Sequence, residues 1–456
     1  MCDFKGKKVL VLGLARSGSA VARLLLRRGA SVVISDLNQD EATLCIADEL
    51  IALGACATLG EHPFALLDHV DLVVKNPGIR YSVPLLVEAA RRGVRIVTEI
   101  EVAGSCTDSP IMAITGSNGK TTTTTMIGEM FTGSPQRAEV VGNIGKAMSG
   151  AIDQTGRNTW LVTEVSSFQL QGTERFHPQV AVLLNAYPTH LDYHGSFDAY
   201  FQAKLRIFAN QTSGDVAVLN FDKDNLRELI SPLRARGVDV QGFSLRTPVA
   251  NGLFVSGSDI VQRGGDGSAD TRVCRVDEIA LPGEFNLENA LAAGTAALAA
   301  GVPLARVVAV WRTFKGVEHR LEWVRSVNGV KFYNDSKATN PQATIRAIAS
   351  FAEPEVVILG GLERGDDLTP LREPLRKHAR AVVVLGESAK RMQRVAAEAG
   401  IAAVKVVETI EEAVVAAAEF ARPGDVVLLS PAAASWDMFP SFEVRGSMFK
   451  QAVHML

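Results

Sequence analysis

The chain has 456 residues, of which 47% are hydrophobic and 21% are charged, the balance of an ordinary globular protein. This length exceeds what one hydrophobic core usually holds, so we expect about three domains. The 47 basic and 50 acidic residues nearly cancel, which argues against the basic surface of a nucleic-acid-binding protein.

The cysteine residues and the apolar runs indicate the cellular compartment in which the protein works. Five scattered cysteines form no C-x-x-C pair: Cys2, Cys45, Cys56, Cys106 and Cys274. This is typical of a reducing cytoplasm without disulfides or cysteine-ligated zinc, so we predict a cytoplasmic protein. The apolar start predicts a first β-strand rather than a secretion signal. The apolar stretch 290–311 contains Pro303 and Arg306, so we predict two core helices there and no membrane association.

The N-terminal and central parts of the chain alternate short apolar runs with helical stretches. The residues 19–29 are helical in pattern and stop at Gly29. Continuous apolar strands alternating with helices predict a parallel sheet covered on both faces. The strand-like runs are 7–13, 31–36, 71–78, 95–100, 110–116, 159–167, 180–192 and 214–222.

The pattern changes between Gly242 and Asp277, where glycine, serine and aspartate interrupt short alternating runs and predict antiparallel hairpins. A helix is expected to start near Asn286. A third α/β series follows, with strand-like runs within 330–340, 355–367, 381–388 and 425–439. We therefore predict an α/β protein with a Rossmann-like N-terminal domain over 1–98, a central P-loop ATPase-like domain over 99–315 and a Rossmann-like C-terminal domain over 316–456.

The segment 113–125, AITGSNGKTTTTT, resembles a phosphate-binding loop but lacks the standard spacing, because Ile114 stands where the first glycine is required. A phosphate cradle needs an apolar strand, a turn with inward N–H groups and a helix N-terminus. The apolar run before Gly116–Gly119 and the helical stretch after it supply all three. Lys120 can reach the β- and γ-phosphates, and the Thr121 hydroxyl can ligate Mg²⁺. The alternative is a simple turn followed by a threonine-rich strand.

Other candidate groups follow this loop. Glu164 ends an apolar strand, His190 and Asp192 follow the next one, and Lys204 lies in a helical stretch. A strand-end carboxylate can face a bound cation. Taken alone, such a glutamate is more often a solvated turn residue, and such a lysine an exposed one. The loop LGLARSG near the N-terminus is a weak dinucleotide signal, because Ala15 replaces the second glycine of the fingerprint.

Several segments together resemble the Mur ligases of peptidoglycan synthesis, in consistent order over essentially the whole chain. They are TGSNGKTTTTT, GNIG, TEVSSFQL, HLDYHGSFDAYFQAKLRIF, GVEHRLEWV and YNDSKATNPQAT. The shortened loop is this family's own form of the P-loop. NDSKATN and LSPAAASWDMF are similar to segments of the members that add D-glutamate.

The resemblance implies a reaction. UDP-N-acetylmuramoyl-L-alanine would take the γ-phosphoryl group of ATP on its carboxylate and become an acyl phosphate. The amine of D-glutamate would attack, and a tetrahedral intermediate would collapse to an amide, leaving ADP and phosphate. Two anions must meet in this reaction, so cations must neutralise them.

The resemblance also implies site residues. ATP would be bound by Gly116, Ser117, Asn118, Gly119, Lys120, Thr121, Thr122, Asn289, Arg320 and Asp335, and the UDP substrate by Arg16, Ser17, Asp36, Asn76, Gly78 and Asn143. D-glutamate would be bound by Lys337, Thr339, Arg364, Ser435 and Phe442. Two Mg²⁺ ions would be held by Thr121, Glu164, His190 and a carbamylated Lys204, and the catalytic groups would be Lys120, Glu164, His190, Lys204 and Lys337.

Two positions depart from the family pattern. Thr189 stands where an aspartate usually precedes the metal-site histidine, and Asp192 is a candidate substitute. Arg364 stands where a lysine often pairs with the glutamate side chain, and arginine can make that contact bidentately.

Three other functions stay open at this point. The chain could be another amide ligase of the superfamily, such as a different Mur enzyme or a folylpolyglutamate synthase. It could be a Rossmann oxidoreductase, or a nucleotide-gated binding protein without catalysis. For the ligase we expect a monomer whose third domain closes over the second when ATP binds, with a hinge near Lys315–Gly316.

Overall fold

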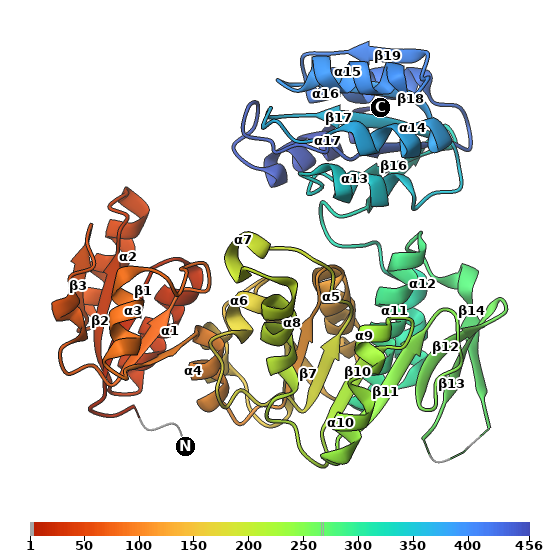
Figure 1. Ribbon diagram of the computed structural model, residues 1–456. Helices are drawn as coiled ribbons and strands as arrows, with labels where there is room; N and C mark the ends of the chain where they lie inside the picture. The colour runs from red at the N-terminus through yellow and green to blue at the C-terminus, as the bar shows by residue number, and fades with distance from the viewer. Residues whose placement is uncertain (1–3, 266, 268) are drawn as a thin grey trace. The chain divides into compact units, whose positions relative to one another are not determined.

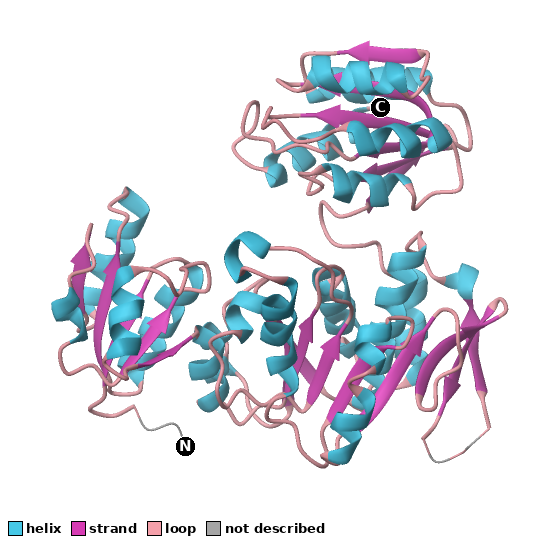
Figure 2. Ribbon diagram, viewed as in Figure 1, coloured by secondary structure: helices cyan, strands magenta, loops and turns pink. Residues whose placement is uncertain are grey.

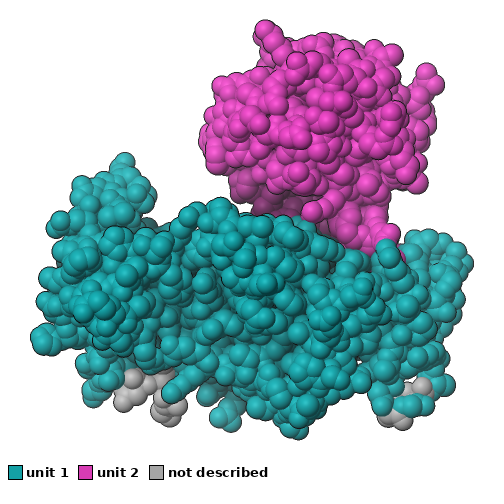
Figure 3. All heavy atoms as spheres, viewed as in Figure 1, with its two compact units in different colours: residues 1–278, 288–312 teal, residues 279–287, 313–456 magenta. Residues whose placement is uncertain are grey.

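The computed structural model describes residues 4–265, 267 and 269–456, so Cys2 lies outside the described residues. The described residues form three β-sheets. The chain divides into two compact units (Figure 3). Unit 1 comprises Met1–Glu278 and Glu288–Arg312, and unit 2 comprises Ile279–Leu287 and Thr313–Leu456.

The N-terminal sheet of unit 1 is entirely parallel, with the order β3-β2-β1-β4-β5 (Figure 1). The order reverses between β1 and β4, and the carboxyl ends of strands at such a reversal form a ligand crevice. The predicted strands are confirmed, except that Glu99 begins a helix instead of extending the fourth run, and β3 and α2 were not predicted. The elements are β1 (Lys8–Leu12), α1 (Arg16–Arg27), β2 (Ser31–Asp36), α2 (Glu41–Ala52), β3 (Cys56–Leu59), β4 (Leu72–Lys75), α3 (Pro84–Arg91) and β5 (Arg95–Val97).

The central sheet of unit 1 has the order β14-β13-β12-β11-β10-β9-β6-β8-β7. Its strands from β7 to β12 pair in parallel, and β13 and β14 add antiparallel strands at one edge. The elements are α4 (Glu99–Ser105), β6 (Ile111–Thr115), α5 (Lys120–Phe131), β7 (Arg137–Gly142), β8 (Thr159–Glu164), α6 (Ser167–Leu170), β9 (Val180–Leu183), α7 (Leu191–His194), α8 (Phe197–Leu205), β10 (Val216–Asn220), α9 (Asp224–Arg227), α10 (Ile230–Ala235), β11 (Asp239–Ser244), β12 (Gly252–Ser256), β13 (Asp259–Arg263), β14 (Thr271–Arg275), α11 (Glu284–Ala299) and α12 (Leu304–Thr313).

Two predictions for this region need correction. The hairpins expected after Gly242 exist as β12–β13 and β13–β14, but β12 pairs in parallel with β11, so the series is only partly antiparallel. The run 180–192 is strand only to Leu183, because polar and proline residues follow. The predicted pair of helices over 290–311 is confirmed as α11 and α12. Among the described residues, no helix has both the length and the apolar character needed to cross a bilayer.

The sheet of unit 2 has the order β15-β16-β20-β17-β18-β19, and only β15–β16 is antiparallel. Figure 2 shows helices flanking its strands. Neighbouring residues of β17 go to different cores: Val357 and Leu359 join one buried cluster, and Val356 and Ile358 the other. A continuous apolar run is therefore needed, because both faces are covered. The elements are β15 (Glu322–Val327), β16 (Val330–Asn334), α13 (Pro341–Ile348), β17 (Glu355–Gly360), α14 (Arg372–His378), β18 (Ala379–Leu385), α15 (Ala389–Glu398), β19 (Ala403–Val406), α16 (Ile410–Phe420), β20 (Val426–Leu429) and α17 (Phe442–Met455).

Candidate active site

The glycine-rich turn between β6 and α5 is shaped by two glycines. Gly119 caps α5 with φ of +83°, a left-handed conformation that L-residues rarely adopt. A Cβ atom there would lie 2.2 Å from Asn289 Oδ1, and one on Gly116 would lie 3.0 Å from Leu184 Cβ. The N–H groups of the first turn of α5 have no partner within the helix, so the turn can present them to an anion.

Polar residues after β9 hold this turn in place. The Asn185 carbonyl accepts from Ser117 N at 3.1 Å, and Asn185 Oδ1 accepts from Asn118 N at 3.0 Å. The Ser117 hydroxyl lies 2.7 Å from the Tyr200 hydroxyl. Asn185 and Tyr200 were missed in the sequence. The sequence did contain a signal for Asn185, because this residue lies just beyond the end of the buried strand β9. Glu164 was chosen as a candidate for the same reason, its place at the end of a strand.

Two lysine side chains meet at one backbone carbonyl. Lys120 Nζ donates to Gly116 O at 2.8 Å and to Ser117 O at 3.1 Å. Lys204 Nζ donates to the same Gly116 O at 2.9 Å and to Thr115 Oγ1 at 3.3 Å. Lys204 is 1% exposed, so it is not the surface lysine of the ordinary alternative. Burial and the Lys120 charge lower the pKa of Lys204 well below its usual value, and Glu164 partly opposes them.

Glu164 presents a buried carboxylate at the end of β8, where its Cα pairs with that of Ile114 on the P-loop strand. Its Oε1 accepts from Asn143 Nδ2 at 2.7 Å, while its buried Oε2 has no hydrogen-bond partner. Leaving a buried carboxylate oxygen unpaired costs free energy. Oxygen ligands suit Mg²⁺, and the Thr121 hydroxyl lies in the first turn of α5, so the residues present fit a cation here. Within the described part of the chain, no cluster of three His, Cys, Asp or Glu side chains forms a metal site.

His190 occupies the N-cap position of α7 with φ of +54°. Its ring centroid lies 5.0 Å from that of Phe168. Burial and the charges of Lys120 and Lys204 lower the pKa of His190, while Asp192 raises it. Both lysines therefore act electrostatically on the His190 ring. The Asp192 side chain is 75% exposed and pairs with Arg80 at 3.1 Å.

Five of the predicted UDP-binding residues lie at the carboxyl end of the N-terminal sheet, and the sixth, Asn143, follows β7 of the central sheet beside Glu164. Asp36 Oδ2 accepts from Leu14 N at 2.6 Å, which fixes the loop after β1. Arg16 donates to Asn143 O at 2.7 Å and to Gly145 O at 3.0 Å. Asn143 N in turn donates to Glu164 O at 2.9 Å. Ser17 Oγ lies 3.5 Å from Asn76 Nδ2, and Asn76 Oδ1 accepts from Gly78 N at 3.2 Å.

The predicted D-glutamate residues gather within unit 2. Lys337 Nζ lies 5.0 Å from the centroid of the Phe442 ring, and Arg364 donates to Thr339 O at 3.3 Å. The Arg445 guanidinium is 1% exposed and donates to Ser336 O at 2.9 Å and to Ala433 O at 3.1 Å. It therefore ties the loop that carries Lys337 to the loop that carries Ser435.

The predicted nucleotide residues divide between the units. Asn289 lies in unit 1, 3.4 Å from the Thr123 hydroxyl, whereas Arg320 and Asp335 lie in unit 2. Asp335 Oδ1 accepts from Leu321 N at 3.2 Å, and Oδ2 accepts from Ser430 Oγ at 2.8 Å. Burial raises the pKa of Asp335 to about 7. Asp335 therefore fixes the turn that contains Arg320, a role that the sequence did not predict.

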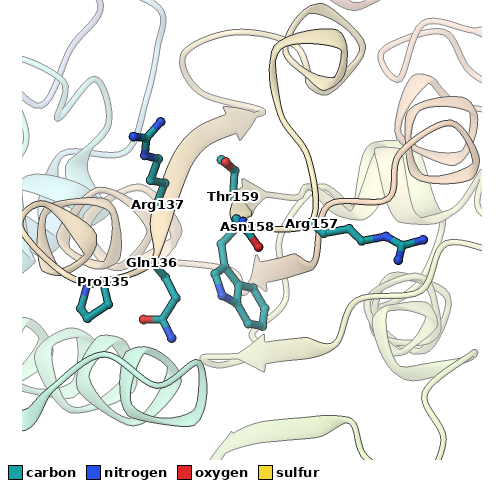
Figure 4. Close-up of a pocket in the computed structure, with 7 residues that line it drawn as sticks. Pro135, Gln136, Arg137, Arg157, Asn158 and Thr159 are labelled. Atoms are coloured by element: carbon teal, nitrogen blue, oxygen red, sulfur yellow. The ribbon is translucent and has the colours of Figure 1, made fainter.

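A pocket of about 540 Å³ (Figure 4) lies where β7 and β8 begin. The P-loop instead follows the end of β6, which runs parallel to β8. None of the predicted site residues lines it. Its two arginines, Arg137 and Arg157, point away from each other, so they do not converge on one ligand. Its lining residues are Pro135, Gln136, Arg137, Arg157, Asn158, Thr159 and Trp160.

Comparison with known proteins identifies the family. Three family models match in order: the Mur ligase MurD-like N-terminal domain at residues 7–98, the Mur ligase middle domain at 114–297, and the Mur ligase glutamate ligase domain at 319–433. A UDP-N-acetylmuramoylalanine–D-glutamate ligase of Pelotomaculum thermopropionicum is 45% identical over 451 residues, covering 99% of this chain and 98% of its own. One from Geobacillus kaustophilus is 44% identical over 455 residues, covering 99% and 98%.

The chain belongs to the Mur ligase family. This confirms the resemblance found in the sequence. Solved structures agree at the level of fold. The UDP-N-acetylmuramate-alanine ligase MurC of Thermotoga maritima matches with a TM-score of 0.59 at 21% identity, covering 98% of this Mur ligase and 99% of that chain. The MurF ligase of Thermotoga maritima in complex with ADP matches with a TM-score of 0.56 at 18% identity, covering 93% and 95%.

Proposed function

We propose that this Mur ligase uses ATP to join D-glutamate to UDP-N-acetylmuramoyl-L-alanine in peptidoglycan synthesis, releasing ADP and phosphate. The observation that carries the proposal is the similarity over the whole chain, at 43–45% identity, to enzymes named UDP-N-acetylmuramoylalanine–D-glutamate ligase. Such a reaction brings a carboxylate, a triphosphate and an amine together, and the two anions repel each other. The site must therefore supply positive charge where they meet.

The residues around the P-loop provide that charge. The first turn of α5 and Lys120 would bind the phosphates of ATP, together with Gly116, Ser117, Asn118, Gly119 and Thr122. Asn289 would contact the adenine, Arg320 the phosphates and Asp335 the ribose. Thr121, Glu164, His190 and Lys204 would hold two Mg²⁺ ions, which supply charge neutralisation at the phosphoryl group when bound. The unpartnered Glu164 oxygen supports this assignment.

Lys204 is proposed to be carbamylated. Its burial and lowered pKa favour the neutral amine, which is the form that can add CO₂. The neutral amine adds CO₂ with formation of an N–C bond and loss of one proton, and it becomes an anionic carbamate. Such a group would attract the ammonium of Lys120, which donates to the same Gly116 carbonyl as Lys204.

The two substrates would bind at separate loop clusters. The UDP end would lie at Arg16, Ser17, Asp36, Asn76, Gly78 and Asn143, and D-glutamate at Lys337, Thr339, Arg364, Ser435 and Phe442. Lys337 would also act in catalysis. We keep the functional divisions 1–98, 99–315 and 316–456, a monomeric state and a cytoplasmic location as parts of this proposal.

The test is to supply D-glutamate, L-alanine, meso-diaminopimelate or L-lysine with matched UDP precursors and to follow phosphate release. We expect the fastest turnover with D-glutamate and UDP-N-acetylmuramoyl-L-alanine. Faster turnover with another amino acid would reject the assignment. A chain that binds NAD(P) and needs no ATP would be an oxidoreductase instead. Loss of phosphate release in Lys120→Ala would tie the activity to the P-loop.

A further inference from the structure

Lys75 is a buried lysine at the carboxyl end of β4, and it is none of the proposed substrate, nucleotide or metal ligands. It is 1% exposed. Its Nζ donates to Ile79 O at 2.8 Å, to Pro77 O at 3.2 Å and to Asn76 O at 3.4 Å. The loop 76–79 therefore wraps its carbonyl oxygens around one ammonium group.

The same ammonium reaches a distant part of the chain. Lys75 Nζ lies 3.2 Å from the Tyr193 hydroxyl, 118 residues away in sequence, and 4.6 Å from the centroid of the Tyr81 ring. The Tyr193 hydroxyl lies 3.0 Å from Ile79 O and 3.2 Å from Pro77 O. Lysine, tyrosine and loop thus form one hydrogen-bonded cluster.

Tyr193 belongs to the segment that begins with His190. Its ring centroid lies 4.5 Å from that of Phe168, and Phe168 contacts the His190 ring at 5.0 Å. On the other side, the loop around Lys75 contains Asn76 and Gly78. The cluster therefore connects the two proposed sites for UDP substrate and metal.

The polar partners that the structure gives Lys75 are neutral: three carbonyls, a phenol and an aromatic ring. Burying an ammonium among neutral groups costs free energy, and burial lowers the pKa of Lys75 to about 7. The apolar residues Leu72–Val74 already supply the core face of β4. Ending β4 with this lysine therefore costs free energy that an apolar residue would not. A role in holding the loop 76–79 and the Tyr193 segment together would account for this cost.

We infer that Lys75 is a positioning residue that couples the UDP-binding loop 76–79 to the His190 segment through Tyr193. The inference rests on the proposed function, because it assigns the roles of both segments. Ordering either segment by its ligand orders the other through the shared ammonium, so binding of the UDP substrate and of Mg²⁺ strengthen each other.

The experiment uses Lys75→Met, Tyr193→Phe, the double variant and the exposed control Lys7→Met in the full chain. We measure KM for UDP-N-acetylmuramoyl-L-alanine, the Mg²⁺ concentration for half-maximal activity and KM for D-glutamate. We expect the first two to rise about tenfold in Lys75→Met, the size of effect expected for a lost charged hydrogen bond, with KM for D-glutamate unchanged. Tyr193→Phe keeps the ring packing and should shift the same two constants in the same direction.

The double variant decides whether the two residues act together. If they do, its constants lie close to those of Lys75→Met instead of the product of the single effects. Independent effects, an equal change in all constants or a change in kcat alone would overturn the inference. If Lys75→Met does not fold, Tyr193→Phe still carries the test.

A separate binding measurement distinguishes failure of this inference from failure of the proposed function. If the wild type releases no phosphate with D-glutamate, calorimetric binding of UDP-N-acetylmuramoyl-L-alanine with and without Mg²⁺ replaces the kinetics. We expect Mg²⁺ to tighten this binding in the wild type and in Lys7→Met but not in Lys75→Met or Tyr193→Phe. A wild type without this linkage would refute the inference.

Discussion

Lys204 and Lys120 both donate to the Gly116 carbonyl, an arrangement that places two ammonium groups at one acceptor. Burial and, next to it, the charge of Lys120 lower the pKa of Lys204 well below its usual value, which favours the neutral amine. Lys204, for which an exposed position was the ordinary alternative, is only 1% exposed. Its chemistry follows from this burial.

The first prediction concerns Lys204. Lys204→Ala removes a proposed metal-supporting group, so we expect the Mg²⁺ requirement for phosphate release to rise by about 10–100-fold. The wild type should also lose activity reversibly in buffer stripped of CO₂. The exposed Lys405→Ala should change neither property. Full activity of Lys204→Ala, or indifference of the wild type to CO₂, would contradict the carbamate.

The second prediction concerns Glu355 at the start of β17. Its side chain is fully buried, neither oxygen has a partner, and burial raises its pKa to about 9. The folded chain therefore keeps a proton that the unfolded chain loses near the ordinary value. The free energy of unfolding then falls as pH rises between these values, by up to about 1.4 kcal/mol per pH unit.

Glu355→Gln removes this titration, so its stability should depend less on pH and exceed that of the wild type at pH 8–9. Urea unfolding from pH 6 to 9 measures the difference. Glu49→Gln is the matched control, because Glu49 pairs with Arg23 near the surface at 2.6 Å and its pKa is lowered. A wild-type slope equal to that of Glu355→Gln would disprove the account.

At the scale of elements, the turn from β6 into α5 gives the third prediction. Gly119→Ala combines a left-handed backbone with a Cβ placed 2.2 Å from Asn289 Oδ1. We expect KM for ATP to rise at least about tenfold, because the turn must move to relieve the contact. Gly54→Ala is the control: its φ is +102°, but a Cβ there meets nothing within 4 Å. It should cost about 1–2 kcal/mol of stability and leave KM for ATP unchanged.

Helices and strands were predictable from the sequence where the local pattern of apolar residues determines them. Apolar runs such as Val356–Leu359 indicated strands because both faces of their sheets are covered. β7 was missed, since its residues are mostly exposed or half-buried and its pattern is weak. Lys120 and Glu164 became candidates through their places at a turn and at a strand end. Lys75 was not, because its role depends on Tyr193, 118 residues away.

At the scale of the whole molecule, the proposed reaction needs Lys120 of unit 1 and Lys337 of unit 2 at one reaction centre. We therefore predict that a non-hydrolysable ATP analogue with the UDP substrate lowers the radius of gyration measured by X-ray scattering. The expected hinge is Lys315–Gly316, where Gly316 has φ of +98°. Lys120→Ala should show no such change. Identical wild-type profiles with and without ligands would count against closure.

The path of the chain between its units has a consequence for dissecting the protein. The chain passes from one unit to the other after Glu278, Leu287 and Arg312. The short passage Ile279–Leu287 brings Gly283 beside Ser350 and packs Phe285 on the core of unit 2. A fragment beginning at Thr313 would lack part of its own core. A single proteolytic cut just beyond Arg312 would instead leave the two pieces associated, because Ile279–Leu287 of the first piece packs on the core of the second.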